Sequence, residues 1–129
     1  MRIILADHHA QPRSGLKALL GEHPEFHLIG EAVDAQGLLT LAETELADLV
    51  LIDCELPGIY FDDLITRLHA LEPAPVIIVM SSEFEHSRKA LKAGADAFVS
   101  KTDDPGWLLE TLQKFENREK KVSSVSLIR

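Results

Sequence analysis

Four consecutive apolar residues, Leu49-Val50-Leu51-Ile52, run directly into an acid, Asp53, near the middle of the chain. Two further apolar runs also stop at a polar residue, namely Ile3-Ile4-Leu5-Ala6 before Asp7 and Val76-Ile77-Ile78-Val79-Met80 before Ser81. Unbroken apolar runs of this length are typical of strands that are covered on both faces, as in a parallel sheet. Each run therefore predicts a buried strand with a polar side chain at its carboxyl end.

Leucine-rich segments with helical spacing separate these runs. We expect five helices, over residues 12–21, 35–46, 64–71, 85–93 and 105–115. Two weaker strand candidates are residues 26–31 and 97–100. Strand and helix then alternate five times, which predicts one α/β domain with a parallel sheet and right-handed crossovers.

The 129 residues carry a net charge of −8, and the acidic excess lies in residues 1–116, whereas residues 117–129 are basic. An acidic body without a basic stripe repels phosphate backbones, so we expect no direct nucleic-acid binding by these residues. The single cysteine, Cys54, excludes an intramolecular disulfide and suits a reducing compartment. The first apolar run is too short for a signal peptide, and no stretch approaches a membrane span. We therefore expect a soluble, cytoplasmic protein.

Four polar side chains follow the predicted strands: Asp7, Asp53, Ser81 and Lys101. In an open parallel sheet, ligands bind beyond the carboxyl ends of the strands. Two neighbouring carboxylates repel unless a cation lies between them, and a hard cation such as Mg²⁺ takes oxygen ligands. A lysine and a hydroxyl would meet an anion from the other side. The set predicts a phosphoryl-transfer site, although each residue alone could be a helix cap or a surface group.

Four blocks of sequence point to one family. They are Ala6-Asp7-His8-His9, Gly30-Glu31-Ala32, Leu51-Ile52-Asp53-Cys54-Glu55-Leu56-Pro57-Gly58 and Ala90-Leu91-Lys92-Ala93-Gly94-Ala95-Asp96-Ala97-Phe98-Val99-Ser100-Lys101. With these blocks, residues 1–116 resemble the receiver domain of two-component response regulators, most of all the LuxR/NarL-like subfamily with a C-terminal helix-turn-helix. The resemblance implies a flavodoxin-like, doubly wound five-stranded parallel sheet of order 2-1-3-4-5 with five helices. Residues 117–129 then form a helix end and linker, followed by an output domain if the natural chain is longer.

The resemblance also implies roles for single residues in signal transduction. Asp53 would accept a phosphoryl group from a histidine kinase, Ser81 would bind that group and Lys101 would pair with it. Ser81 and Phe98 would form the switch that rearranges on phosphorylation, although core packing explains Phe98 equally well. Such a domain regulates transcription and is not an enzyme, beyond its own phosphorylation and dephosphorylation. A weak homodimer through the last helix, including Trp107, would fit the subfamily.

The expected metal site departs from the family. The resemblance implies that Asp7, Asp53 and the backbone carbonyl of Glu55 bind Mg²⁺, but His8 stands where relatives carry a second acid. Neutral imidazole is a poor ligand for Mg²⁺, although it suits softer metals. We therefore expect weak Mg²⁺ binding, with the Glu55 side chain either replacing the lost carboxylate or pointing to solvent. A serious alternative is a pseudo-receiver that binds its partners without phosphorylation.

Several other groups have weaker claims to a function. His8, His9 and Asp7 could form a transition-metal cluster, but neighbouring side chains on a turn are expected to diverge. The remaining histidines, among them His86, are predicted to have no role, and we do not expect Cys54 to be a nucleophile.

The sequence offers little support for other protein classes. A haloacid-dehalogenase-type phosphatase would need a second Asp where Glu55 stands, together with a second lobe. A flavodoxin would need Ser, Thr and Gly donors in the first loop, which reads Asp7-His8-His9-Ala10. Residues 59–61, Ile-Tyr-Phe, could form a partner surface or a lid, or pack on the third helix.

Overall fold

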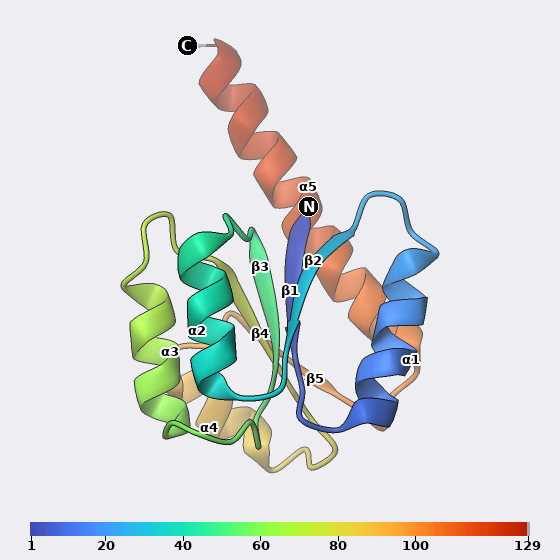
Figure 1. The fold of residues 1–129 in the computed structure, drawn as a ribbon. Helices are drawn as coiled ribbons and strands as arrows, with labels where there is room; N and C mark the ends of the chain where they lie inside the picture. Colours follow the sequence, from blue (N-terminus) through green and yellow to red (C-terminus); the bar gives the residue numbers. More distant parts are fainter. Residues whose placement is uncertain (129) are drawn as a thin grey trace.

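The computed structural model describes the backbone of residues 1–128 and the side chains of residues 1–118. Five strands and five helices alternate along this part of the chain (Figure 1). In chain order they are β1 (Arg2–Ala6), α1 (Ala10–Gly21), β2 (His27–Ala32), α2 (Ala35–Thr44), β3 (Leu49–Asp53), α3 (Phe61–His69), β4 (Val76–Ser81), α4 (His86–Ala93), β5 (Ala97–Ser100) and α5 (Pro105–Ile128).

The strands form one parallel sheet in the order β2-β1-β3-β4-β5. The three apolar runs of the sequence are β1, β3 and β4, which occupy the centre of the sheet, and every residue of β3 is buried. The order reverses between β1 and β3, because the chain leaves β1 toward one edge and then returns to its other side. The predicted doubly wound five-stranded sheet is confirmed, and its switch point lies where Asp7 and Asp53 end their strands.

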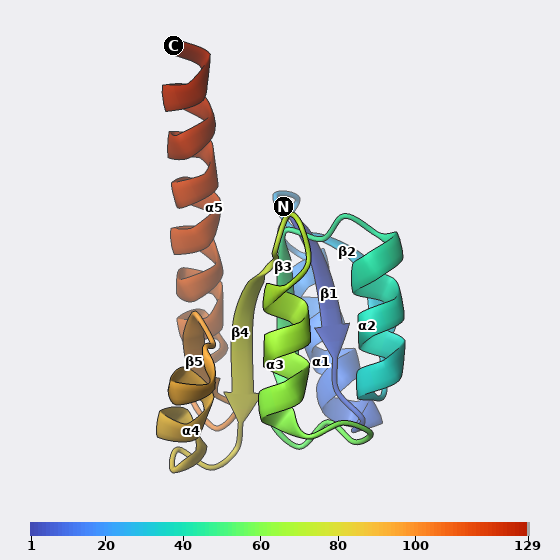
Figure 2. The same cartoon turned by 90° about the vertical axis from the view of Figure 1, so that its left-hand side faces the viewer.

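Helices cover both faces of the sheet and create two separate cores (Figures 1 and 2). On one face, Leu38 of α2 and Leu64 of α3 pack with Ala90 of α4 against the sheet. On the other face, Leu20 of α1 and Leu112 of α5 pack against it. This covering explains why the central strands are apolar on both sides.

The last helix is longer than the sequence predicted. We expected a helix end and linker after Phe115, but α5 continues to Ile128 and extends beyond the sheet (Figures 1 and 2). Loss of apolar periodicity does not stop a helix, and residues 116–124 contain no Gly or Pro and several good helix formers. Arg129 lies outside the described residues. Among the described residues, no helix has both the length and the apolar character needed to cross a membrane.

Candidate functional site

The carboxyl ends of the central strands converge at one edge of the sheet. Asp7 follows β1, Asp53 ends β3, Ser81 ends β4 and Lys101 follows β5. The backbone N–H of Lys101 donates to the Ser81 carbonyl at 2.8 Å, which holds the ends of β4 and β5 together. Asp7, Asp53 and Ser81 are all buried. Polar groups in such a position need a reason to be there, because burial without partners is costly.

Lys101 bridges the two carboxylates. Its Nζ donates to Asp7 Oδ2 at 2.7 Å and lies 3.2 Å from Asp53 Oδ2. Burial alone would raise the pKa of the Asp7 carboxyl, but hydrogen bonds from Lys101 and from the backbone N–H of His9 outweigh it and hold this pKa below its usual value. Burial likewise disfavours the charged form of Lys101, yet its two carboxylate neighbours raise the pKa of the ammonium group. One cation therefore serves two anions, and the cluster of these three side chains keeps a net negative charge.

The two oxygens of Asp53 differ in their surroundings. Oδ1 accepts a hydrogen bond from the backbone N–H of Glu55 at 3.1 Å. Oδ2 is buried and has no hydrogen-bond partner, because the contact with Lys101 Nζ is close but not aligned for a hydrogen bond. The Glu55 side chain is exposed, as expected if it points to solvent.

His8 and His9 turn toward the same carboxylates. The Nδ1 atom of His8 lies 3.6 Å from Asp53 Oδ2, and that of His9 lies 3.4 Å from both Asp53 Oδ2 and Asp7 Oδ1. Their ring centroids are 3.8 Å apart. The expectation that these neighbouring side chains diverge is therefore wrong. The turn between β1 and α1 brings both rings to one side, so the described residues offer two imidazoles beside two carboxylates.

This donor set does not fit Mg²⁺ well. Mg²⁺ demands oxygen ligands in near-octahedral geometry, whereas two of the four side chains that converge here present imidazole nitrogen. The two carboxylates, Asp7 and Asp53, are the acidic side chains of this group. The mismatch expected from His8 alone is therefore enlarged by His9.

The Ser81 hydroxyl contacts His86, a residue for which we predicted no role. Its Oγ accepts a hydrogen bond from the backbone N–H of Glu83 at 3.0 Å and shares another with His86 Nδ1 at 2.8 Å. The same Nδ1 lies 3.1 Å from Cys54 Sγ. Burial raises the pKa of the Cys54 thiol, which agrees with the expectation that it is not a nucleophile. Only the loop between β4 and α4 brings His86 back to Ser81, so spacing in the sequence could not reveal this contact.

Aromatic side chains lie beside the site at the β5 and α3 ends. Phe98 of β5 is half-buried, packs against the core and meets the exposed Phe84 edge to face, with ring centroids 6.3 Å apart. Tyr60 is 84% exposed, whereas Phe61 packs against the core. Of the two aromatics at the start of α3, Tyr60 is thus the one available to a partner.

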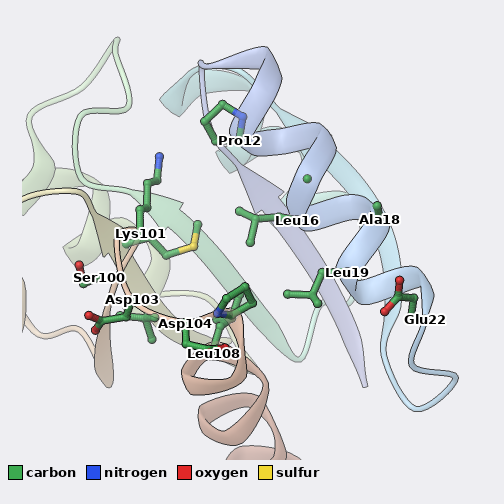
Figure 3. A pocket seen from close by; sticks show the side chains of 14 residues that line it. Pro12, Leu16, Ala18, Leu19, Glu22, Ser100, Lys101, Asp103, Asp104 and Leu108 are labelled. Atoms are coloured by element: carbon green, nitrogen blue, oxygen red, sulfur yellow. The ribbon is translucent and has the colours of Figure 1, made fainter.

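A largely apolar pocket of about 580 Å³ adjoins the site between α1 and the start of α5. Figure 3 shows Leu16 and Leu19 of α1 and Leu108 of α5 among its lining side chains, with Lys101 also on its wall. Of the four strand-end side chains, only Lys101 lines it. The polar chemistry of the site therefore lies at the carboxylates, outside this pocket.

The chain resembles known regulators in sequence. It matches the family model of the response regulator receiver domain over residues 3–113. It is 32% identical to the nitrate/nitrite response regulator protein NarL of Escherichia coli K12 over 114 residues, which are 87% of this chain and 53% of NarL. It is 33% identical over 115 residues to the uncharacterized transcriptional regulatory protein YhcZ of Bacillus subtilis strain 168, covering 88% of this chain and 54% of YhcZ. The chain thus spans about half the length of the curated relatives it matches.

Solved structures with the same arrangement include two at more than 25% identity. A two-component response regulator of the LuxR family from Aurantimonas sp. SI85-9A1 is 28% identical with a TM-score of 0.80, covering 88% of this chain and 82% of that one. A CheY-like receiver domain protein from Methanospirillum hungatei JF-1 is 29% identical with a TM-score of 0.78. The match covers 93% of this chain and 97% of that one.

Proposed function

Because the chain belongs to the response regulator receiver domain family, we propose that Asp53 is the residue that accepts a phosphoryl group from a histidine kinase. The domain is a phosphoacceptor in signalling rather than a catalyst of metabolism. Asp53 stands at the switch point of the sheet, and its Oδ2 is buried without a hydrogen bond. This unbonded oxygen beside an ammonium group is the observation that carries the assignment.

In the transfer, a carboxylate oxygen of Asp53 attacks phosphorus while the bond from phosphorus to the donor's imidazole nitrogen breaks, and the electron pair stays on that nitrogen. The product is an acyl phosphate on Asp53. Lys101 is already charged and already touches both carboxylates, so it can neutralise the phosphoryl oxygens without reorganising. The same machinery supports slow loss of the phosphoryl group to water.

The proposed switch begins at Ser81. To reach a phosphoryl group on Asp53, the Ser81 hydroxyl has to leave His86, which removes the 2.8 Å contact between them. Because His86 is the first residue of α4, losing this contact frees the start of that helix. Phe98 can then turn inward from its contact with Phe84, and the surface formed by α4 and β5 changes.

The partners follow from the family and from the length of the relatives. A histidine kinase supplies the phosphoryl group, and a helix-turn-helix output domain after residue 129 would turn the signal into transcription regulation, since the relatives are about twice as long. We keep residues 1–116 as the receiver unit and residues 117–129 as the connection to that output domain. A cytoplasmic location stays a prediction.

The direct test is phosphorylation by acetyl phosphate, read as the mass of the intact protein. The wild type should gain the mass of one phosphoryl group, Asp53→Asn should gain none, and Asp103→Asn, which neutralises an exposed acid of the β5–α5 loop, should behave like the wild type. Beryllofluoride, which mimics an acyl phosphate, should shift amide signals around Asp53 in the wild type alone. Added mass that persists in Asp53→Asn would refute the assignment. A wild type that gains no mass at all would support the pseudo-receiver, which family membership does not favour.

A further inference from the structure

Four side chains at the switch point converge in a way that phosphoryl transfer does not require. One donor atom from each of Asp7, His8, His9 and Asp53 lies within 4.8 Å of all the others. The side chains of His8 and His9 are 33% and 50% exposed, while those of Asp7 and Asp53 are buried. The two imidazoles therefore lie on the solvent side of the group, and the two carboxylates lie on its buried side.

The spacing of these atoms resembles a tetrahedral coordination shell. A tetrahedral ion with ligands at about 2.0 to 2.1 Å places its ligand atoms about 3.3 to 3.4 Å apart. The three printed separations are 3.4 Å from His9 Nδ1 to Asp7 Oδ1, 3.4 Å from His9 Nδ1 to Asp53 Oδ2 and 3.6 Å from His8 Nδ1 to Asp53 Oδ2. Octahedral Mg²⁺ with ligands at about 2.0 to 2.1 Å would need adjacent atoms only about 2.9 Å apart. These three separations, out of the six that four ligand atoms make, lie nearer the tetrahedral than the octahedral spacing, and all four atoms lie within 4.8 Å of one another.

Donor chemistry points to the same class of ion. Imidazole nitrogen suits Zn²⁺, Co²⁺ and Ni²⁺, whereas Mg²⁺ favours oxygen. Two histidines and two carboxylates complete four-coordinate Zn²⁺ without further ligands. Lys101 bonds Oδ2 of Asp7, and the oxygen facing His9 is Oδ1, so the lysine and an ion need not share an oxygen of that carboxylate.

A second observation concerns the hydrogen bonding of Asp53. Asp53 Oδ2 is a buried carboxylate oxygen without a hydrogen bond, and it faces both imidazoles. Such an atom is costly unless something binds it. A metal ion at the centre of the four side chains would give this oxygen a direct bond in addition to its 3.2 Å contact with Lys101 Nζ, and it would take the net charge of Asp7, Asp53 and Lys101 from −1 to +1.

We propose that Asp7, His8, His9 and Asp53 form a tetrahedral site for one borderline divalent transition-metal ion of the Zn²⁺ and Co²⁺ class. Four protein ligands leave no open coordination position for a phosphoryl oxygen, and the ion takes the Asp53 oxygen that a phosphoryl group needs. The metal-bound form is therefore closed to phosphorylation. This regulatory consequence rests on the proposed function, whereas metal binding itself does not.

Cobalt supplies the test, because four-coordinate Co²⁺ has intense visible bands that octahedral Co²⁺ lacks. The wild type should show these bands at one equivalent of Co²⁺, and Zn²⁺ should displace them. His8→Ala should weaken Zn²⁺ binding at least about ten-fold in calorimetry, because losing even an indirect partner of a metal ligand costs that much. His27→Asn, which removes an exposed imidazole of β2, should bind like the wild type.

Three results would overturn the site. One is a wild-type spectrum with only weak octahedral bands, and another is equal Zn²⁺ affinity in the wild type and His8→Ala. A thiolate-to-cobalt charge-transfer band would place the ion at Cys54 instead.

The regulatory consequence has a separate test. Zn²⁺ should suppress the added phosphoryl mass in the wild type, and a chelator should restore it. Phosphorylation unaffected by saturating Zn²⁺ would overturn the closure, while no phosphorylation of Zn²⁺-free protein in the presence of Mg²⁺ would refute the proposed function and leave the cobalt result standing.

Discussion

At the scale of single residues, we expect His8 to determine how tightly the protein binds Mg²⁺. We expect His8→Asp to tighten Mg²⁺ binding, because it replaces a nitrogen donor by a charged oxygen beside Asp7 and Asp53. A charge-assisted contact of about 1.5 to 3 kcal/mol corresponds to a gain of roughly ten-fold to a hundred-fold. Amide shifts in a Mg²⁺ titration give the affinity, and His27→Asp adds the same charge on β2, away from the site. Equal affinities in the wild type and His8→Asp would mean that another group, such as Glu55, already supplies the missing oxygen.

We expect Asp53, the proposed phosphoacceptor, to lower the stability of the folded protein. Its Oδ2 is buried without a hydrogen bond and shares one lysine with Asp7, so the folded protein bears both desolvation and repulsion. Removing that charge in Asp53→Asn should raise the free energy of unfolding by about 1 kcal/mol in metal-free buffer. Urea unfolding measures the change, with Asp103→Asn as the control for an exposed acid. A less stable Asp53→Asn would show that the contact with Lys101 outweighs these costs.

At the scale of elements, Gly94 fixes the join between α4 and β5. It ends α4 with φ of 114°, and an added Cβ would come within 3.0 Å of the His69 ring. Gly94→Ala should therefore lower the free energy of unfolding by about 1 to 2 kcal/mol, because an L side chain is strained in that conformation. Gly15 inside α1 is the matched control, since its Cβ would meet nothing within 4 Å. Gly15→Ala should instead stabilise by about 0.5 to 1 kcal/mol. Thermal or urea unfolding of both variants should give opposite signs, and equal signs would contradict the argument.

The same scale shows what the sequence could and could not predict. Strands covered on both faces leave unbroken apolar runs, so β1, β3 and β4 and the polar residues at their ends were readable from local pattern. The contact of His86 with Ser81 depends on the path of a loop, and the convergence of His8 with His9 depends on side-chain rotation within a turn. Neither contact can be predicted from the local pattern of the sequence. The length of α5 escaped prediction for a different reason, because its end carries no helix-breaking residue and also loses the apolar stripe.

At the scale of the whole molecule, the proposed site, the proposed switch and the end of α5 lie in different parts of the fold. The residues proposed for metal binding and phosphoryl transfer lie at one edge, where β1, β3, β4 and β5 end. The proposed switch runs through α4 and β5, and Figure 2 shows both beside α5, which continues past the sheet. If the proposed phosphorylation occurs at these carboxylates, it can act on a partner only through a change in the surface of the receiver or in what that surface binds.

We expect the receiver to dimerise through the surface around the start of α5. Trp107 at the start of α5 is 60% exposed, and an exposed aromatic of this kind is a typical centre of a protein interface. We expect a weak dimer in beryllofluoride, measured by sedimentation velocity at high protein concentration and physiological salt, which screens the repulsion between two acidic copies. Trp107→Ser should weaken it by about 2 kcal/mol, roughly thirty-fold in Kd, whereas Tyr60→Ser, which truncates an exposed aromatic before α3, should not. A strict monomer with and without beryllofluoride would refute the dimer, and a dimer unaffected by Trp107→Ser would move the interface away from α5.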